Sequence, residues 1–127
     1  MSKKMIYTTY FGKLNHDPSL FKKVTPVTIC AKPPVNWQGK QYPALAPKYA
    51  FFMKYKEDGD FNAFSKAYNE QVLKNLDPKV IGNQLMLLAA IGTDVALVCY
   101  EKDQNVCHRN LVAAWLRKAG YEVEELI

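Results

Sequence analysis

The side chains best suited to chemistry lie in the twelve-residue stretch CYEKDQNVCHRN, which begins at Cys99. It contains Cys99 and Cys107 with Glu101 between them, and His108 and Arg109 follow directly. Thiolates attack electrophiles, carboxylates and imidazoles move protons, and a guanidinium binds a carboxylate or phosphate through two hydrogen bonds. This combination predicts a reactive or ligand-binding site.

The apolar run DVALV before this stretch predicts where the site lies, because such runs suit strands covered on both faces in a parallel sheet. We expect Cys99 at the carboxyl end of a central strand. Cys107 to Arg109 should form the first turn of the next helix, with Asn105 or Asp103 as its cap. Ligands of open α/β sheets bind beyond the strand ends, and a helix N-terminus there favours anions and lowers the pKa of a cysteine.

Our first hypothesis is an enzyme that acts on a small molecule or nucleotide carrying a phosphate or carboxylate. The nucleophile would be Cys107 or Cys99, and the acid or base would be Glu101 or His108. Arg109 opposes the helix dipole at its position, so it needs an anion nearby, either a ligand or Glu101. We expect it to hold the ligand.

Tyr10 and Trp37 are predicted as further ligand contacts. A second hypothesis is a module that binds nucleotides or nucleic acid without catalysis, in which Trp37 and Tyr42 stack on bases. In a third, the stretch is a structural network, with His108 bonded to a loop carbonyl. Both aromatic residues would then only hold their loop against the core.

No metal and no cofactor are expected. Cys99, Cys107 and His108 are zinc-ligand types, but C-x7-C-H lacks the spacing of common structural zinc sites. The phosphate-binding P-loop pattern and the G-x-S-x-G turn are absent. Cys30 and Cys99 should be buried small residues, which leaves Cys107 as the most reactive thiol.

The elements around the site follow from periodicity and turn residues. Strands are predicted in MIYTTYF from Met5 and in KVTPVTIC ending at Cys30, with Pro26 at the start of the second. The proline-rich segment Ala31–Pro47 is expected to be a long loop. The next 45 residues predict three helices, the second capped by Asp60.

The third of these helices should begin with Asp77 as cap and Pro78 at its first position, and Gly92 should end it. A last helix is predicted from about Val106 to Ala119, with Trp115 on its core face. The alternating segment YEVEEL follows as an edge strand. The third helix is expected to place these residues in the core: Val80, Ile81, Leu85, Met86, Leu87, Leu88 and Ile91.

This order predicts a single α/β domain over residues 1–127. Its expected form is a small, mainly parallel sheet of about four strands with helices on both faces, in three layers. The net charge of +5 is dispersed and only mildly favours anionic partners; nucleic acid is one such partner. An odd count of three cysteines and the lack of a long apolar run predict a cytoplasmic protein without a membrane span.

The segment ALVCYEKDQNVCHRNLVAAWL, Ala96–Leu116, resembles the C-terminal signature of the domain of unknown function 488 (DUF488) family. That signature is an apolar strand, a cysteine, an acidic residue two positions on, and Cys-His-Arg at a helix start. IYTTYFGKL and LAPKYAFFMKY resemble the family's first strand and post-loop helix. Asn110 stands where serine is common. Lys32 stands where many members have an arginine after the second strand, so the resemblance implies that Lys32 is a second cation for the ligand. The resemblance implies a compact α/β fold with a polar cluster at the strand ends, and it implies no reaction.

Overall fold

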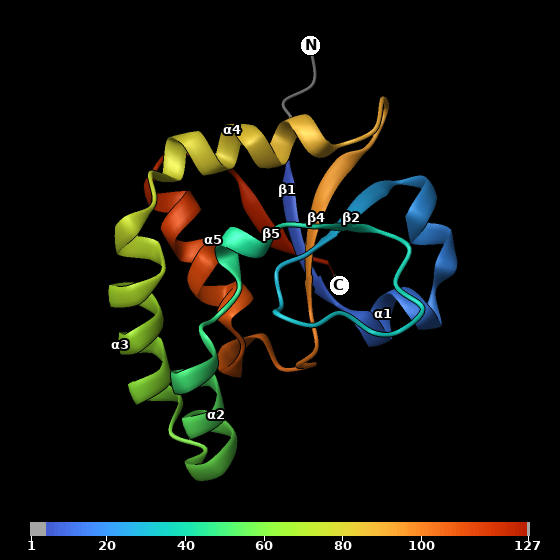
Figure 1. The fold of residues 1–127 in the computed structure, drawn as a ribbon. Helices are drawn as coiled ribbons and strands as arrows, with labels where there is room; N and C mark the ends of the chain where they lie inside the picture. The colour runs from blue at the N-terminus through green and yellow to red at the C-terminus, as the bar shows by residue number, and fades with distance from the viewer. Residues whose placement is uncertain (1–4, 127) are drawn as a thin grey trace.

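The fold is built on one parallel sheet, seen in a computed structural model that describes residues 5–126. The strand order is β3-β2-β4-β1-β5, and every pairing in it is parallel (Figure 1). The prediction of a parallel α/β sheet is confirmed, with five strands instead of about four. The strands are β1 (Ile6–Tyr10), β2 (Val24–Thr28), β3 (Lys40–Gln41), β4 (Asp94–Cys99) and β5 (Val123–Glu125).

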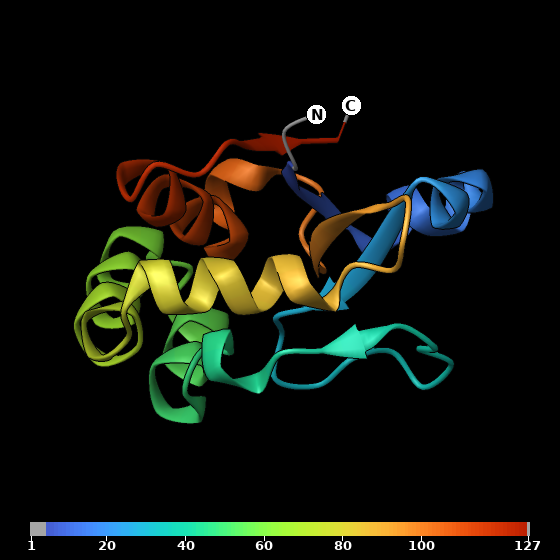
Figure 2. The ribbon, with the colours of Figure 1, turned by 90° about the horizontal axis from the view of Figure 1, so that it is seen from above.

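Helices cover both faces of the sheet but unequally (Figure 2). The short α1 (Phe11–His16) and the 3-10 turn η1 (Pro18–Lys22) lie on one face and enclose a small core with Val98. The other face carries the larger core and four helices. They are α2 (Tyr49–Asp58), α3 (Phe61–Gln71), α4 (Pro78–Leu88) and α5 (His108–Lys118).

Strand β4 occupies the centre of the sheet, as its continuous apolar run predicts. Residues 95–99 are all buried between β1 and β2. Val95, Leu97 and Cys99 belong to the larger core, whereas Val98 belongs to the smaller one. This alternation places the thiol of Cys99 on the same face of the sheet as α5.

Two details of the proline-rich region differ from the sequence expectations. Pro26 lies inside β2, not at its start. An N–H at this position would point toward β3, the side to which the Thr28 carbonyl also points. Since β3 begins only opposite Val27, no strand lies there to accept a hydrogen bond, and proline is tolerated. The expected loop after β2 contains β3 and the 3-10 turn η2 (Pro43–Leu45), and β2 ends two residues before Cys30.

The helix caps agree with the sequence, but the core face of α4 is narrower than predicted. Asp60 accepts a hydrogen bond from Ala63 N (3.1 Å), and Asp77 accepts one from Lys79 N (2.9 Å). In α4, Ile81 and Leu85 are buried in the core. The core prediction is wrong for Val80, Leu87 and Ile91, which are exposed, because only one stripe of α4 faces the sheet and Ile91 lies beyond the helix end. Trp115 packs half-buried against the core.

A buried tyrosine ties α3 to the loop after β3. The hydroxyl of Tyr68 donates to the Leu45 carbonyl at 2.5 Å, and both residues are fully buried. We expect Tyr68→Phe to lower the free energy of unfolding by about 1–3 kcal/mol, because the buried carbonyl loses its donor. Urea unfolding measures this, and Tyr49→Phe at an exposed position is the control. Equal midpoints for Tyr68→Phe and wild type would contradict the prediction.

Candidate functional site

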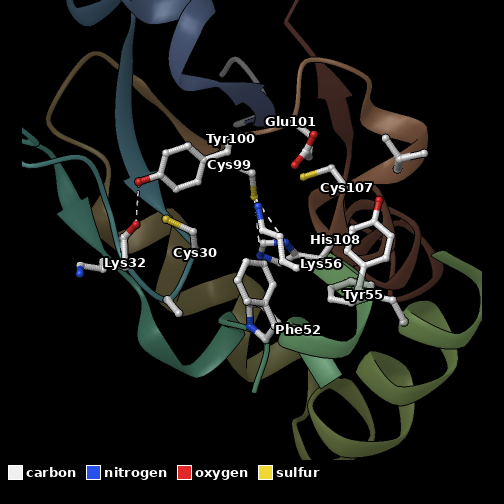
Figure 3. Close-up of a pocket in the computed structure, with 14 residues that line it drawn as sticks. Cys30, Lys32, Phe52, Tyr55, Lys56, Cys99, Tyr100, Glu101, Cys107 and His108 are labelled. Atoms are coloured by element: carbon white, nitrogen blue, oxygen red, sulfur yellow. Dashed lines mark hydrogen bonds between the residues drawn. The ribbon is translucent and has the colours of Figure 1, made fainter. Parts of the chain in front are cut away.

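A pocket of about 120 Å³ lies beyond the carboxyl ends of β2 and β4 (Figure 3). Three groups of residues form its wall: those that follow β2, those around the β4–α5 connection, and several from α2 and α3. The connection contains the 3-10 turn η4 (Gln104–Val106). The lining residues are Cys30, Ala31, Lys32, Pro47, Phe52, Tyr55, Lys56, Phe64, Cys99, Tyr100, Glu101, Val106, Cys107 and His108.

Three buried side chains, Cys99, Cys107 and His108, form a cysteine–histidine cluster in this wall. Their sulfur and nitrogen atoms all lie within 4.8 Å of one another. His108 Nε2 lies 2.8 Å from the carbonyl oxygen of Ile29 and donates to it, because a carbonyl only accepts. The Cys99 sulfur lies 3.6 Å from Nε2 and 3.8 Å from Nδ1 of the same ring. His108 therefore both lines the pocket and joins α5 to the end of β2.

The start of α5 places Cys107 one position earlier than predicted. Cys107 is the N-cap residue with extended backbone, and α5 begins at His108. Asp103 caps the preceding turn η4 by accepting from Asn105 N (2.9 Å), so neither Asp103 nor Asn105 caps α5. The thiol of Cys107 thus stands at the positive end of the helix dipole.

The environment separates the acidities of the three thiols. Cys99 and then His108 hold the pKa of Cys107 at about 4, since a hydrogen bond from the Cys99 thiol and the nearby ring stabilise its thiolate against the cost of burial. Burial raises the pKa of Cys99 well above its ordinary value, and it also raises that of Cys30. Cys107 is therefore the most acidic of the three thiols, and Cys99 holds its proton more firmly.

Charged and aromatic residues complete the pocket. In Figure 3 Cys107, Glu101 and Tyr55 gather on one side, and Lys32 and Tyr100 lie on the other. The hydroxyl of Tyr100 donates to the carbonyl of Lys32 (2.7 Å). Burial, then the charges of Glu101 and Cys107, raises the pKa of Tyr55. Glu101 and Cys107 therefore bring negative charge to this side of the pocket, while Lys32 and Lys56 bring positive charge to its lining.

Arg109 lies outside the lining of this pocket, completely buried beneath the β4–α5 connection. Its Nη2 and Nε bind the carboxylate of Glu125 at 2.8 and 3.0 Å. The carbonyls of Glu101 and Lys102 accept further bonds at 2.5 and 3.1 Å. Against the effect of burial, the carboxylate of Glu125 and the nearby Cys107 side chain raise the pKa of Arg109. The anion that Arg109 needs is thus supplied by Glu125 in β5, and Glu101 contributes a backbone oxygen.

Five of the eight predicted site residues meet in the pocket: Cys99, Glu101, Cys107, His108 and Lys32. The other three lie elsewhere. The ring of Tyr10 lies beneath the guanidinium of Arg109, 5.8 Å away. Trp37 packs edge-on against Phe11 (5.1 Å) and its Nε1 donates to the Lys40 carbonyl.

Sequence reasoning missed the contribution of α2, which brings Phe52, Tyr55 and Lys56 to the pocket. The aromatic residues of this helix have the spacing of a core stripe, so nothing local marks them as pocket residues. Cys30 was expected to be buried, yet it is half-buried and lines the pocket. Glu125 was also missed; the acidic run at the chain's end was the available signal.

The fold and this site define a small α/β protein with a thiol-rich pocket at the carboxyl ends of its strands. The sequence profile described as the active DUF488-N3 subclade (DUF488-N3a) matches residues 12–120. The chain therefore belongs to the DUF488 family, as the Cys-His-Arg signature indicates. No curated protein and no solved structure matches it. Within residues 5–126, no helix has both the length and the apolar character needed to cross a bilayer.

The separated acidities predict the order in which the thiols react. With a chelator present, iodoacetamide should modify Cys107 first. Its rate should stay nearly constant from pH 6 to 8, because a group with a pKa of about 4 is already ionised there. An ordinary thiol with a pKa of about 8.5 gains roughly a hundredfold in rate over this range. Mass spectrometry of digested samples identifies the modified residue, and first modification of Cys30 or Cys99 would contradict the prediction.

The Arg109–Glu125 pair predicts a strong effect on stability from residues outside the pocket lining. Glu125→Ala should lower the free energy of unfolding by about 3 kcal/mol, since it removes the carboxylate that pairs with the fully buried guanidinium. Glu124→Ala, at the exposed neighbouring position of β5, is the matched control. Denaturant unfolding of both proteins measures the difference. Equal stability of the two variants would show that Arg109 does not depend on Glu125.

Proposed function

We propose that the protein is an enzyme in which Cys107 is the nucleophile, acting on a small molecule or nucleotide that carries a phosphate or carboxylate. The observation that carries this proposal is geometric. Cys107 lies at a helix N-terminus in the wall of a pocket that also contains Glu101. A nucleophile, a proton-transfer group and space for a substrate thus share one site, the arrangement expected of covalent catalysis.

The residues have different roles in this mechanism. Cys107 Sγ forms a bond to an electrophilic carbon of the substrate as the bond to the leaving group breaks. The leaving group takes its proton from solvent, and the Glu101 carboxylate then takes a proton from the water that attacks the covalent intermediate and releases the product. The Cys99 thiol stays protonated and hydrogen-bonds the thiolate. His108, held by the Ile29 carbonyl, positions both sulfurs.

The size and lining of the pocket limit the substrate. A cavity of 150 Å³ holds a benzene molecule, so a pocket of about 120 Å³ accepts one group of about that size. Phe52, Tyr55 and Tyr100 provide aromatic contacts for this group. Lys32 and Lys56 provide positive charge for a phosphate or carboxylate. The ligand-binding role predicted for Arg109 finds less support, because Glu125 and two carbonyls occupy its donors.

Two further observations support an enzyme in a reducing compartment. The matching subclade is described as active, which agrees with catalysis. All three cysteines are free thiols in the structure, and Cys107 must stay reduced to act as a nucleophile. We therefore place the protein in the cytoplasm.

The alternative function, nucleic-acid binding without catalysis, has less support. It requires Trp37 and Tyr42 to stack on bases. Trp37 is engaged by Phe11 and the Lys40 carbonyl, and the hydroxyl of Tyr42 donates to the Gln84 side chain. Both aromatic residues hold their loop in place.

The test combines binding with detection of a covalent intermediate. The protein is incubated with a panel of nucleotides, phosphate esters and acyl carboxylates, and melting curves and intact masses are recorded. A substrate at 100 times its Kd should stabilise the protein by about 2.7 kcal/mol. A trapped adduct should appear in wild type and be absent from Cys107→Ala.

Lysine variants test the binding of the charged group. Lys56→Gln should weaken the stabilisation by the same compound, whereas Lys54→Gln, outside this pocket, should not. No adduct and no stabilisation across the panel, together with salt-dependent oligonucleotide binding, would favour the alternative function.

A further inference from the structure

We infer that the cysteine–histidine cluster is a binding site for one thiophilic divalent cation, with zinc as the fitting ion. Cys99 Sγ, Cys107 Sγ and His108 Nδ1 would be its protein ligands, and the fourth position would face the pocket. This inference goes beyond the proposed function and stands on the geometry of the cluster alone.

The first support is distance. Zinc binds sulfur at about 2.3 Å and histidine nitrogen at about 2.0–2.1 Å in a tetrahedron, which separates neighbouring sulfur and nitrogen ligands by about 3.6 Å. The Cys99 sulfur lies 3.8 Å from His108 Nδ1. One ligand atom from each of the three residues, counting either ring nitrogen of His108, lies within 4.8 Å of the others, so tetrahedral separations require shifts of about an ångström.

The second support is the orientation of the histidine ring. Metal-bound histidines almost always donate their other ring N–H to a carbonyl or carboxylate, which fixes the tautomer and aims the free nitrogen at the metal. Here Nε2 donates to the Ile29 carbonyl at 2.8 Å. Nδ1 then has its lone pair free and lies beside the Cys99 sulfur. The Cys99 sulfur is at a similar distance from Nε2 (3.6 Å), so the hydrogen bond to Ile29 leaves Nδ1 as the nitrogen available to a metal ion.

The third support is charge and access. Two thiolates and a neutral imidazole balance a divalent cation, so the complete site is neutral and suits burial. Binding releases the proton of the Cys99 thiol to solvent. All three residues line the pocket, which gives the ion a route in and leaves room for water at the fourth position. Three protein ligands with one open position are typical of catalytic rather than structural zinc.

Sequence spacing disfavoured zinc because the ligands lie on two elements. Cys99 ends β4, while Cys107 and His108 open α5, and the connection folds back to bring them together. A bound ion and an alkylating reagent would compete for Cys107, because a coordinated thiolate is no longer a free nucleophile. Zinc binding and nucleophilic reactivity are therefore separate states of one site.

The experiment measures metal binding directly, without an activity readout. The reduced, metal-free protein is titrated with zinc against a chromophoric chelator, and with cadmium, whose thiolate charge-transfer absorption counts the coordinated sulfurs. We expect one ion per chain, two thiolates per cadmium, and protection of Cys107 from iodoacetamide by zinc. Loss of a residue that only orients a ligand weakens zinc binding by roughly 10–100-fold, so Cys99→Ser should weaken it by about a hundredfold or more.

Cys30→Ser is the matched control, because Cys30 lines the same pocket but is not part of the cluster. It should leave zinc affinity and the cadmium absorption unchanged. Equal weakening by Cys30→Ser and Cys99→Ser would overturn the assignment, as would three thiolates per cadmium or a wild type that takes up no zinc at micromolar concentration. If Cys99→Ser does not fold, the thiolate count on wild type and the nitrogen NMR shift of His108 Nδ1 on zinc addition decide the question.

Discussion

The guanidinium of Arg109 is the point on which the β4–α5 region depends. It is fully buried, and it connects β5 through Glu125 with the connection through the carbonyls of Glu101 and Lys102. A buried cation costs several kcal/mol of desolvation unless its donors are satisfied and its charge is balanced. The chain meets this demand with one carboxylate and two carbonyls, so the segments that carry them cannot move independently.

This constraint explains how a cation can stand at the start of α5. Opposing the helix dipole costs about 0.3–1 kcal/mol, whereas breaking a buried ion pair costs about 3–5 kcal/mol. The free energy of the ion pair with Glu125 therefore outweighs the penalty from the helix dipole, and this pair determines where Arg109 lies. Cys107 and His108, its immediate neighbours, are fixed at the pocket by the same contacts. Arg109 thus supports Cys107 and His108 from behind, and its role as a ligand contact stays a prediction.

The parts of the fold that the sequence predicted are those determined by local patterns. The apolar run of β4, the caps Asp60 and Asp77, and the start of α5 within two residues all depend on neighbours close in the chain. Glu125 escaped prediction because it meets Arg109 only through the pairing of β5 beside β1, which no local pattern encodes. Pocket residues from α2 escaped for a related reason. A helix presents the same aromatic spacing to a core and to a cavity beside that core.

The same physical setting accounts for both proposed uses of the cluster. Burial disfavours two negative sulfurs side by side, so without an ion one proton stays on Cys99 and hydrogen-bonds the thiolate of Cys107. A divalent cation removes that restriction, since it compensates both charges at once and replaces the proton. Chemistry at this site therefore depends on what neutralises the second sulfur. When a proton neutralises Cys99, the Cys107 thiolate can attack a substrate. When a metal ion binds instead, both sulfurs are its ligands, and the open coordination position faces the pocket.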